Sequence, residues 1–392
     1  MSGRLDGVLD DPFRPFFLLV PLAAVAAVLP MPALWFGVLG TWSDLTPGGW
    51  HGHEQVFGFL TAALAGFLLT ALAAWTATVG IGRRRLLLLV GLWAAGRAGF
   101  WLDPLLPAAV VAALDLPFLV LLLVSVLPAL RPPERRPWQF VLALVGLLVV
   151  NGTFHASRMG WLDLPPERAA TAGLSLFMVL IALALGRILP VTLRAALGEC
   201  GQAATVRMAP GRGYLAALTL VLYGVAELVA PATPVTGWVA LAAACAQMER
   251  LTELHHGRAL LRPQVLPFYM AQVWMAVGLG GIGLAALGVG LDAAAVRHAL
   301  GLGAAGTVAV TVLSIVSLRH TGRSFPLPSA TLVPPLLIAA AALMRVLIPH
   351  AAPHLTALWA VTVPALVWAA AFAVWLAVFG RWLLFPSAPS TS

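Results

Sequence analysis

The chain alternates between long apolar runs and short polar breaks. Each run has about 20 mostly apolar residues, the length that an α-helix needs to cross the hydrocarbon core of a membrane. The breaks collect Pro, Gly and Arg, as loops between membrane spans do. Twelve runs fit this description, at about residues 15–39, 51–78, 86–103, 105–130, 138–155, 168–190, 213–230, 234–251, 266–289, 294–318, 329–349 and 355–384. The pattern therefore predicts an all-α fold, a polytopic transmembrane helical bundle of about 12 spans.

No connection between the predicted spans is long enough to form a soluble domain. The longest, at about residues 191–212, is too short to bury a core of its own. We therefore expect residues 1–385 to form a single transmembrane domain of about 12 helices, and residues 386–392 ("PSAPSTS") to form a disordered tail. The first apolar run follows acidic residues and prolines, unlike the start of a cleavable signal peptide, so we interpret it as a retained span.

Composition and charge agree with a multi-pass membrane protein. Of the 392 residues, 61% are hydrophobic and only 10% are charged, whereas soluble domains have about 25% charged residues. The 23 basic residues are all arginines and exceed the 15 acidic residues, which gives a formal net charge of +8. Because the arginines are scattered between apolar segments and form no basic domain, we expect no nucleic-acid partner.

The arginines also predict how the chain is oriented. With an even number of spans, both termini share one side of the membrane. Most of the arginines fall on that side, and only Arg158, Arg168 and Arg297 fall on the opposite side. Cytoplasmic loops carry the excess of positive charge in membrane proteins, so we expect both termini to be cytoplasmic.

The two cysteines exclude several kinds of site. Cys200 and Cys245 lie far apart and form no CxxC or CxxCH motif. A disulfide framework, a thiolate metal site and a covalently attached c-type haem are therefore all poorly supported.

Four histidines are predicted to meet at the outer face of the membrane. His51 and His53 lie at the outer end of the second span, His155 at the outer end of the fifth, and His298 at the outer start of the tenth. Neutral imidazole is the commonest protein ligand for haem iron and copper, and such sites need several converging rings. We therefore predict that these four histidines bind metal; the alternative for any one of them is a solvated or hydrogen-bonded histidine at a helix end.

The spacing of these residues adds detail. On a helix, His51 and His53 project roughly 200° apart, so one helix could serve two centres. His51 and Glu54 are three residues apart and share a face, and so do Asn151 and His155 at a spacing of four. Asn151 is then either an orienting partner of a ligand or a packing polar group.

Several motifs, in order along nearly the whole chain, carry a family resemblance. They are "PFRPFFLL" at 12–19, "WHGHEQVFGF" at 50–59, "GRILPVTLRAAL" at 186–197, "RHALGLGAAGT" at 297–307 and "RHTGR" at 319–323. Together they resemble the NnrS family. The resemblance implies a twelve-span protein of the bacterial inner (cytoplasmic) membrane that contains haem and copper and is linked to denitrification and to relief of nitric oxide stress.

We assign roles under that resemblance by topology and chemistry. A b-type haem would take His53 and His298 as axial ligands, and His51 and His155 would serve copper or a second haem; the sequence does not separate these roles. Arg97 and Arg297 are candidate partners of haem propionates, because a guanidinium fork suits a carboxylate. The alternative for Arg297 is an interfacial arginine that reaches water.

Glu54 is the candidate catalytic residue. An intramembrane carboxylate is a functional candidate, and any reduction of nitric oxide consumes protons that it could carry. The alternative is a structural Glu54 that orients His51 by a hydrogen bond. His255, His256 and His320 fall on the predicted cytoplasmic side. We interpret the first two as a solvated loop near lipid headgroups and the third as a structural residue.

The predicted function is a haem-copper membrane protein that binds nitric oxide, or another small diatomic, and protects the cell against nitrosative stress. A nitric oxide reductase-like activity stays open, because the chain has no electron-supplying domain and would need an electron donor protein. The alternative is a secondary transporter of a small solute or metal, since twelve spans with few buried charges also describe many transporters.

Overall fold

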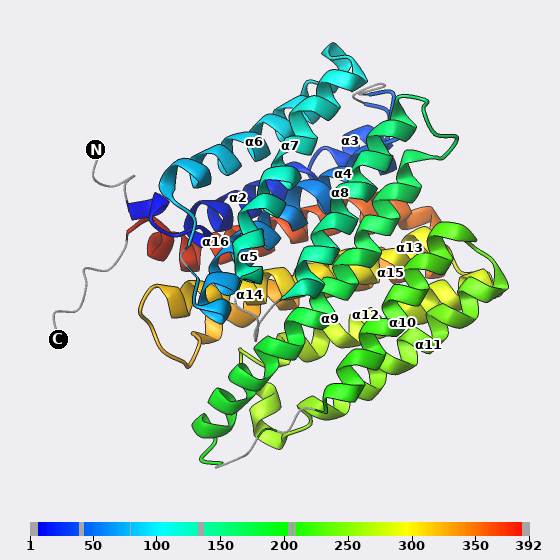
Figure 1. The fold of residues 1–392 in the computed structure, drawn as a ribbon. Helices are drawn as coiled ribbons and strands as arrows, with labels where there is room; N and C mark the ends of the chain where they lie inside the picture. The colour runs from blue at the N-terminus through cyan, green and yellow to red at the C-terminus, as the bar shows by residue number, and fades with distance from the viewer. Residues whose placement is uncertain are drawn as a thin grey trace. The chain divides into compact units, whose positions relative to one another are not determined.

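The protein is all-α. The computed structural model describes residues 7–385 except 39–42, 79, 132–136, 203–205, 207 and 208. Every element of secondary structure in those residues is a helix (Figure 1). The tail predicted at 386–392 lies outside the described residues.

The helices form two compact units. Unit 1 comprises Met1–Gly173 with the short segments Arg319–Gly322 and Phe379–Ser392. Its helices are α2 (Phe13–Ala26), α3 (Met31–Trp35), α4 (Pro47–His53), η2 (Glu54–Leu60), α5 (Thr61–Thr76), α6 (Arg83–Trp101), α7 (Ala108–Val126) and α8 (Trp138–Arg158). Within it α6 packs against α7, α7 against α8, and α2 against α5. The single domain predicted from the sequence stays a prediction.

Unit 2 comprises Leu174–Leu318 and Arg323–Val378. Its helices are most of α9 (Pro166–Glu199), then α10 (Pro210–Val229), α11 (Pro234–Arg250), α12 (Leu266–Ala286), α13 (Ala293–His298), η8 (Ala299–Gly306), α14 (Thr307–His320), α15 (Val333–Ala351), η11 (Thr356–Thr362) and α16 (Val363–Leu384). Arg319 and His320 at the end of α14, and α16 from Phe379 on, belong to unit 1.

Ten helical segments in the described residues are long and apolar enough to cross a membrane. They confirm a polytopic membrane protein. The other two predicted spans are also helices: α6 carries Arg83, Arg84, Arg85 and Arg97 among its 19 residues, and α11 is only 17 residues long. The number of spans and the orientation of the termini stay predictions.

Helix α9 is longer than the sequence pattern indicates. The residues from 191 on were expected to be a connection, but α9 continues through Pro190 to Glu199. A proline inside a helix removes one backbone hydrogen bond without necessarily ending the helix. Here the Pro190 carbonyl oxygen accepts a hydrogen bond of 2.8 Å from Arg194 Nε, within the continued helix.

Three predicted spans contain a π-helical segment that the sequence pattern does not reveal. These segments are η2, η8 and η11. η2 begins directly after His53, and η8 begins directly after His298. π-helical turns are rare and occur frequently at functional sites, because the wider turn changes where side chains and carbonyls point.

Candidate functional site: a buried histidine–carboxylate group

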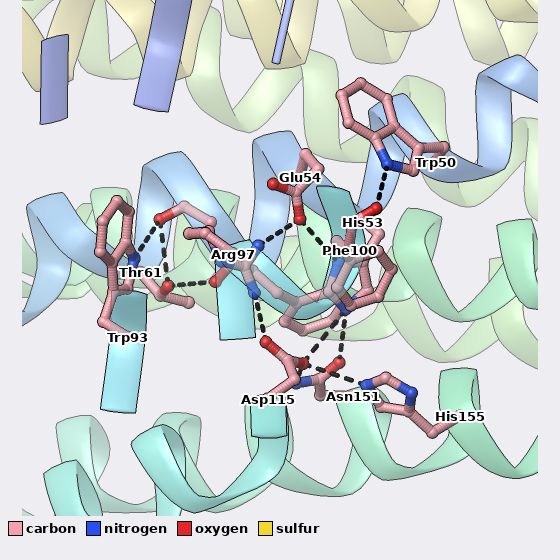
Figure 2. A network of polar contacts seen from close by, with 12 residues as sticks. Trp50, His53, Glu54, Thr61, Trp93, Arg97, Phe100, Asp115, Asn151 and His155 are labelled. Carbon is pink, nitrogen blue, oxygen red and sulfur yellow. Dashed lines mark hydrogen bonds and ion pairs between the residues drawn. The ribbon is translucent and has the colours of Figure 1, made fainter. Parts of the chain in front are cut away.

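Two histidines and one aspartate of unit 1 converge in its interior. One ligand atom from each of His53, Asp115 and His155 lies within 4.8 Å of the other two. Asp115 Oδ2 is 3.3 Å from His53 Nε2 and 3.0 Å from His155 Nε2. The three residues are buried, at 0%, 4% and 1% exposure respectively. Three different helices, α4, α7 and α8, therefore direct potential metal ligands to one point (Figure 2).

The residues before helix α4 determine where this helix begins. Thr46 is its N-cap, and the Thr46 hydroxyl oxygen accepts a hydrogen bond of 2.9 Å from the Gly49 backbone N–H. Pro47 follows at the first helical position, where its fixed φ favours helix initiation. Seven residues later the α-helix ends at His53 and the π-helix η2 begins.

Within η2 the Gly58 carbonyl accepts hydrogen bonds from side chains. Trp93 Nε1 donates one of 3.0 Å, and Thr61 Oγ1 a longer one of 3.3 Å. Trp93 lies on α6. The bond from Trp93 holds the π-helical turn against α6 and so places His53 and Glu54 beside that helix.

Arg97 joins two buried carboxylates. Its Nη1 donates to Glu54 Oε1 and its Nη2 donates to Asp115 Oδ1 (Figure 2). A Cβ atom at Gly58 would lie 2.7 Å from Arg97 Nη1, so only a glycine leaves room for the guanidinium there. Arg97 carries one positive charge, and Glu54 and Asp115 carry one negative charge each. With both imidazoles neutral, these residues together have a net negative charge. A buried net charge is costly unless it is compensated, so the group favours an added cation.

Asn151 contacts both the His53 imidazole and the Asp115 carboxylate. Its Nδ2 donates a hydrogen bond of 2.8 Å to Asp115 Oδ2, and its Oδ1 is 3.0 Å from His53 Nε2. Asn151 and His155 lie one turn apart on α8. The amide is therefore an orienting partner of the two central groups, which is one of the two roles the spacing allowed.

Aromatic rings enclose His53. The Phe100 ring stacks on it at a centroid distance of 3.8 Å, and Phe154 and Phe57 pack at 4.5 and 5.0 Å. Trp50 Nε1 donates a hydrogen bond of 3.3 Å to the Phe100 carbonyl and fixes the stacking residue. The shell excludes water and strengthens the electrostatic interactions inside it.

The donor set fits a metal ion. Two imidazole nitrogens and one carboxylate oxygen suit copper and other first-row transition metals. The separations of 3.0 and 3.3 Å are close to those between ligands of one tetrahedral ion, whose bonds to N and O are about 2.0–2.2 Å long. His155 Nδ1 is buried without a hydrogen-bond partner, as His155 binds Asp115 through Nε2. The part of the chain that the structure describes holds one such group.

The packing at His53 does not fit a haem. Its ring is stacked on Phe100, and both nitrogens lie within 3.4 Å of polar atoms: Nδ1 of Glu54 Oε1, and Nε2 of Asn151 and Asp115. A flat macrocycle at either nitrogen would have to displace these groups. The axial-ligand role predicted for His53 stays untested, but these residues fit a metal ion better.

The other predicted histidines lie outside this group. His51 is half-buried, and its Nδ1 is 3.0 Å from the Ala27 carbonyl oxygen. His298 Nδ1 is 2.7 Å from the Ala294 carbonyl oxygen. A neutral imidazole that donates from Nδ1 carries its lone pair on Nε2, the arrangement usual for metal-bound histidine. His298 belongs to unit 2, where Arg297 Nη2 donates a hydrogen bond of 2.6 Å to Glu227 Oε1.

The comparison with protein families now decides the chain's relationship. The family model described as "NnrS protein" matches residues 7–387, nearly the whole chain. The chain belongs to the NnrS family. A comparison with curated proteins gives no significant match.

The central carboxylate of this NnrS-family chain, Asp115, was not among the predicted site residues. Asp115 lies inside the fourth predicted span, in "ALDLPFL", and an intramembrane carboxylate is by itself a signal of function. The contacts described for Glu54 are with Arg97 and, at 3.4 Å, with His53 Nδ1, while the predicted hydrogen bond to His51 stays a prediction. The contact with Arg97 depends on how η2 and α6 pack, which residue spacing within one helix cannot reveal.

Proposed function

We propose that this NnrS-family protein binds copper at the His53–Asp115–His155 group and haem b at a separate place, in the bacterial inner membrane. We further propose that it binds nitric oxide and thereby protects the cell against nitrosative stress. The observation that carries the proposal is the buried group of two imidazoles and one carboxylate whose ligand atoms all lie within 4.8 Å of one another.

Each residue of the group has a defined task in this proposal. His53, Asp115 and His155 supply the ligand atoms, and a copper ion held by three protein ligands would supply an open coordination position for a small diatomic. Asn151 keeps Asp115 oriented through the hydrogen bond that its Nδ2 donates to Oδ2. Arg97 compensates part of the carboxylate charge and ties α6 to α7.

Glu54 lies where its carboxylate could accept or donate a proton beside the proposed copper site. Its carboxylate is buried and lies 3.4 Å from His53 Nδ1, while Arg97 holds the same oxygen. Reduction of nitric oxide consumes protons and electrons. Since no electron-supplying motif is found in the sequence, turnover would require an electron donor protein, whereas binding alone would not.

For the haem, the described contacts favour His51 or His298. In both residues Nδ1 lies next to a backbone carbonyl oxygen, which directs the lone pair to Nε2. The haem would be b-type, because the two cysteines are not arranged for thioether attachment. Arg297, predicted to meet a propionate, would have to share its guanidinium with Glu227.

Metal analysis of purified variants tests the copper assignment. We expect His53→Ala, Asp115→Asn and His155→Ala to lose copper. His350→Ala is the matched control, because His350 lies in unit 2 with its Nδ1 2.8 Å from the Val346 carbonyl oxygen. Equal copper content in all four variants and the native protein would refute the assignment. Copper uptake into proteoliposomes without retained copper would instead favour the transporter.

A further inference from the structure

Arg158 joins three segments of unit 1 at one end of the metal group. It is the last residue of α8. Its Nη2 is 2.6 Å from Asp44 Oδ1 and 2.5 Å from Asp103 Oδ1. Asp44 precedes the N-cap of α4, and Asp103 follows the end of α6. We call these three residues the Arg158 clamp.

The clamp lies just beyond the metal group along α8, which carries His155, and along α6, which carries Arg97. On α8, Arg158 follows His155 by three residues, about 4.5 Å along the axis. On α6, the chain passes Arg97 and Phe100 before it reaches Asp103. The clamp therefore closes the end of the bundle next to the metal group.

Unpartnered polar atoms lead from the clamp to the metal group. Arg158 Nη1, Ser157 Oγ and His155 Nδ1 are all buried without a hydrogen-bond partner. His155 and Arg158 are three residues apart and share a face of α8, whereas Ser157 projects to the opposite side. Unpartnered buried polar atoms are costly, and water molecules are their usual partners. A cluster of buried hydrophobic residues that includes Trp50, Phe100 and Phe154 lies in the same unit.

The two arms of the clamp differ in exposure. The Asp103 side chain is fully buried, whereas the Asp44 side chain is 57% exposed. Arg158 Nε also donates to Asp44, at 3.0 Å from Oδ1. Ion pairs with a water-exposed partner are weak, because water competes for both charges. The Asp44 arm is therefore the one that opens.

We propose that the Arg158 clamp is the gate through which a metal ion reaches His155, with Asp44 as its moving arm. This inference rests on the proposed metal binding at His53, Asp115 and His155. When the Asp44 arm opens, its carboxylate is released to meet a hydrated cation, and the unpartnered nitrogens of Arg158 and His155, on one face of α8, line the way inward. Arg158 acts on access and not on the bound metal.

Thiol labelling tests the gate without any metal. His155→Cys places a thiol where the proposed route ends, and its rate of reaction with a charged thiol reagent is measured by peptide mass spectrometry on the full chain in detergent. We expect Asp44→Asn to raise that rate about tenfold. The matched control is Glu167→Gln, since Glu167 accepts a hydrogen bond from Thr46 Oγ1 at the same end, outside the clamp. Equal labelling with and without Asp44→Asn overturns the gate.

Chelator kinetics then test whether the gate admits the metal. We expect copper loss to a strong chelator to be about tenfold faster in Asp44→Asn than in the native protein or Glu167→Gln, at equal copper content and thermal stability. A clamp that only stabilises the fold would lower the melting temperature and leave the rate unchanged, which contradicts the proposal. If Asp44→Asn speeds labelling but the native protein binds no copper, the gate is supported and the proposed function is refuted.

Discussion

Gly96 lies directly against Asp115: a Cβ atom at position 96 would be 2.8 Å from Asp115 Oδ1 and 3.0 Å from its Cα atom. The second of these atoms is backbone, which cannot turn away. The close approach of α6 and α7 therefore needs glycine at this position. It places the next residue, Arg97, within hydrogen-bonding reach of Asp115.

Gly96→Ala is expected to separate α6 from α7. The Arg97–Asp115 ion pair would weaken and the copper content would fall, as measured by metal analysis together with thermal unfolding. Gly91→Ala on the same helix is the matched control, because nothing lies within 4 Å of its added Cβ. The control should keep its copper and be as stable as the native protein or slightly more stable. Normal copper content in Gly96→Ala would contradict this explanation.

Arg97→Ala is expected to be strongly destabilising. It leaves Glu54 and Asp115 buried without their common cation, and breaking a buried ion pair costs about 3–5 kcal/mol. Denaturant unfolding of the purified variant measures the loss. Replacement of Arg297, whose ion pair with Glu227 is partly exposed, should cost less. If both variants lose the same unfolding free energy, burial does not explain the stability that the Arg97 ion pairs contribute.

Glu54→Gln is expected to keep copper but bind it less tightly. Glu54 is not a member of the ligand group, yet its charge favours a cation nearby, and loss of such a supporting partner lowers metal affinity roughly 10–100-fold. Competition with a chelator of known affinity measures the change. Any proton-consuming turnover should fall more than binding does. Unchanged affinity together with unchanged turnover would exclude both roles for Glu54.

The two cofactors are expected to separate by mutation. His155→Ala should lose copper and keep the Soret band of haem b, because His155 belongs to the buried ligand group. At least one of His51→Ala and His298→Ala should lose haem and keep copper, because in both residues Nδ1 lies next to a backbone carbonyl oxygen. Optical spectra and metal analysis of the three variants test this. Loss of both signals in any one of them, at normal yield, would point to one shared centre.

Much of the fold could be predicted because apolar runs of span length and their polar breaks dominate the sequence. Each predicted run corresponds to a helix, including α6 and α11, which are too charged or too short to count as spans by themselves. The continuation of α9 past Pro190 and the π-helical turns were not predictable. A proline does not always end a helix, and a π-helical turn has no distinct hydrophobic period.

The candidate site could be predicted only in part, since its members come from different helices. Topology placed His53 and His155 at one face, but the pairing of Arg97 with two carboxylates depends on the approach at Gly96 and on the turn after His53. Asp115 was within reach of sequence reasoning as a carboxylate inside a span. A search that weighs buried acids beside histidines would have included it.

Copper X-ray absorption spectroscopy of the purified protein tests the central claim most directly. We predict scattering from two imidazoles and one carboxylate oxygen in the native protein and in His350→Ala, and no bound copper in His155→Ala. Copper bound without imidazole scattering, or with the same scattering in native protein and His155→Ala, would contradict a copper site at His53, Asp115 and His155.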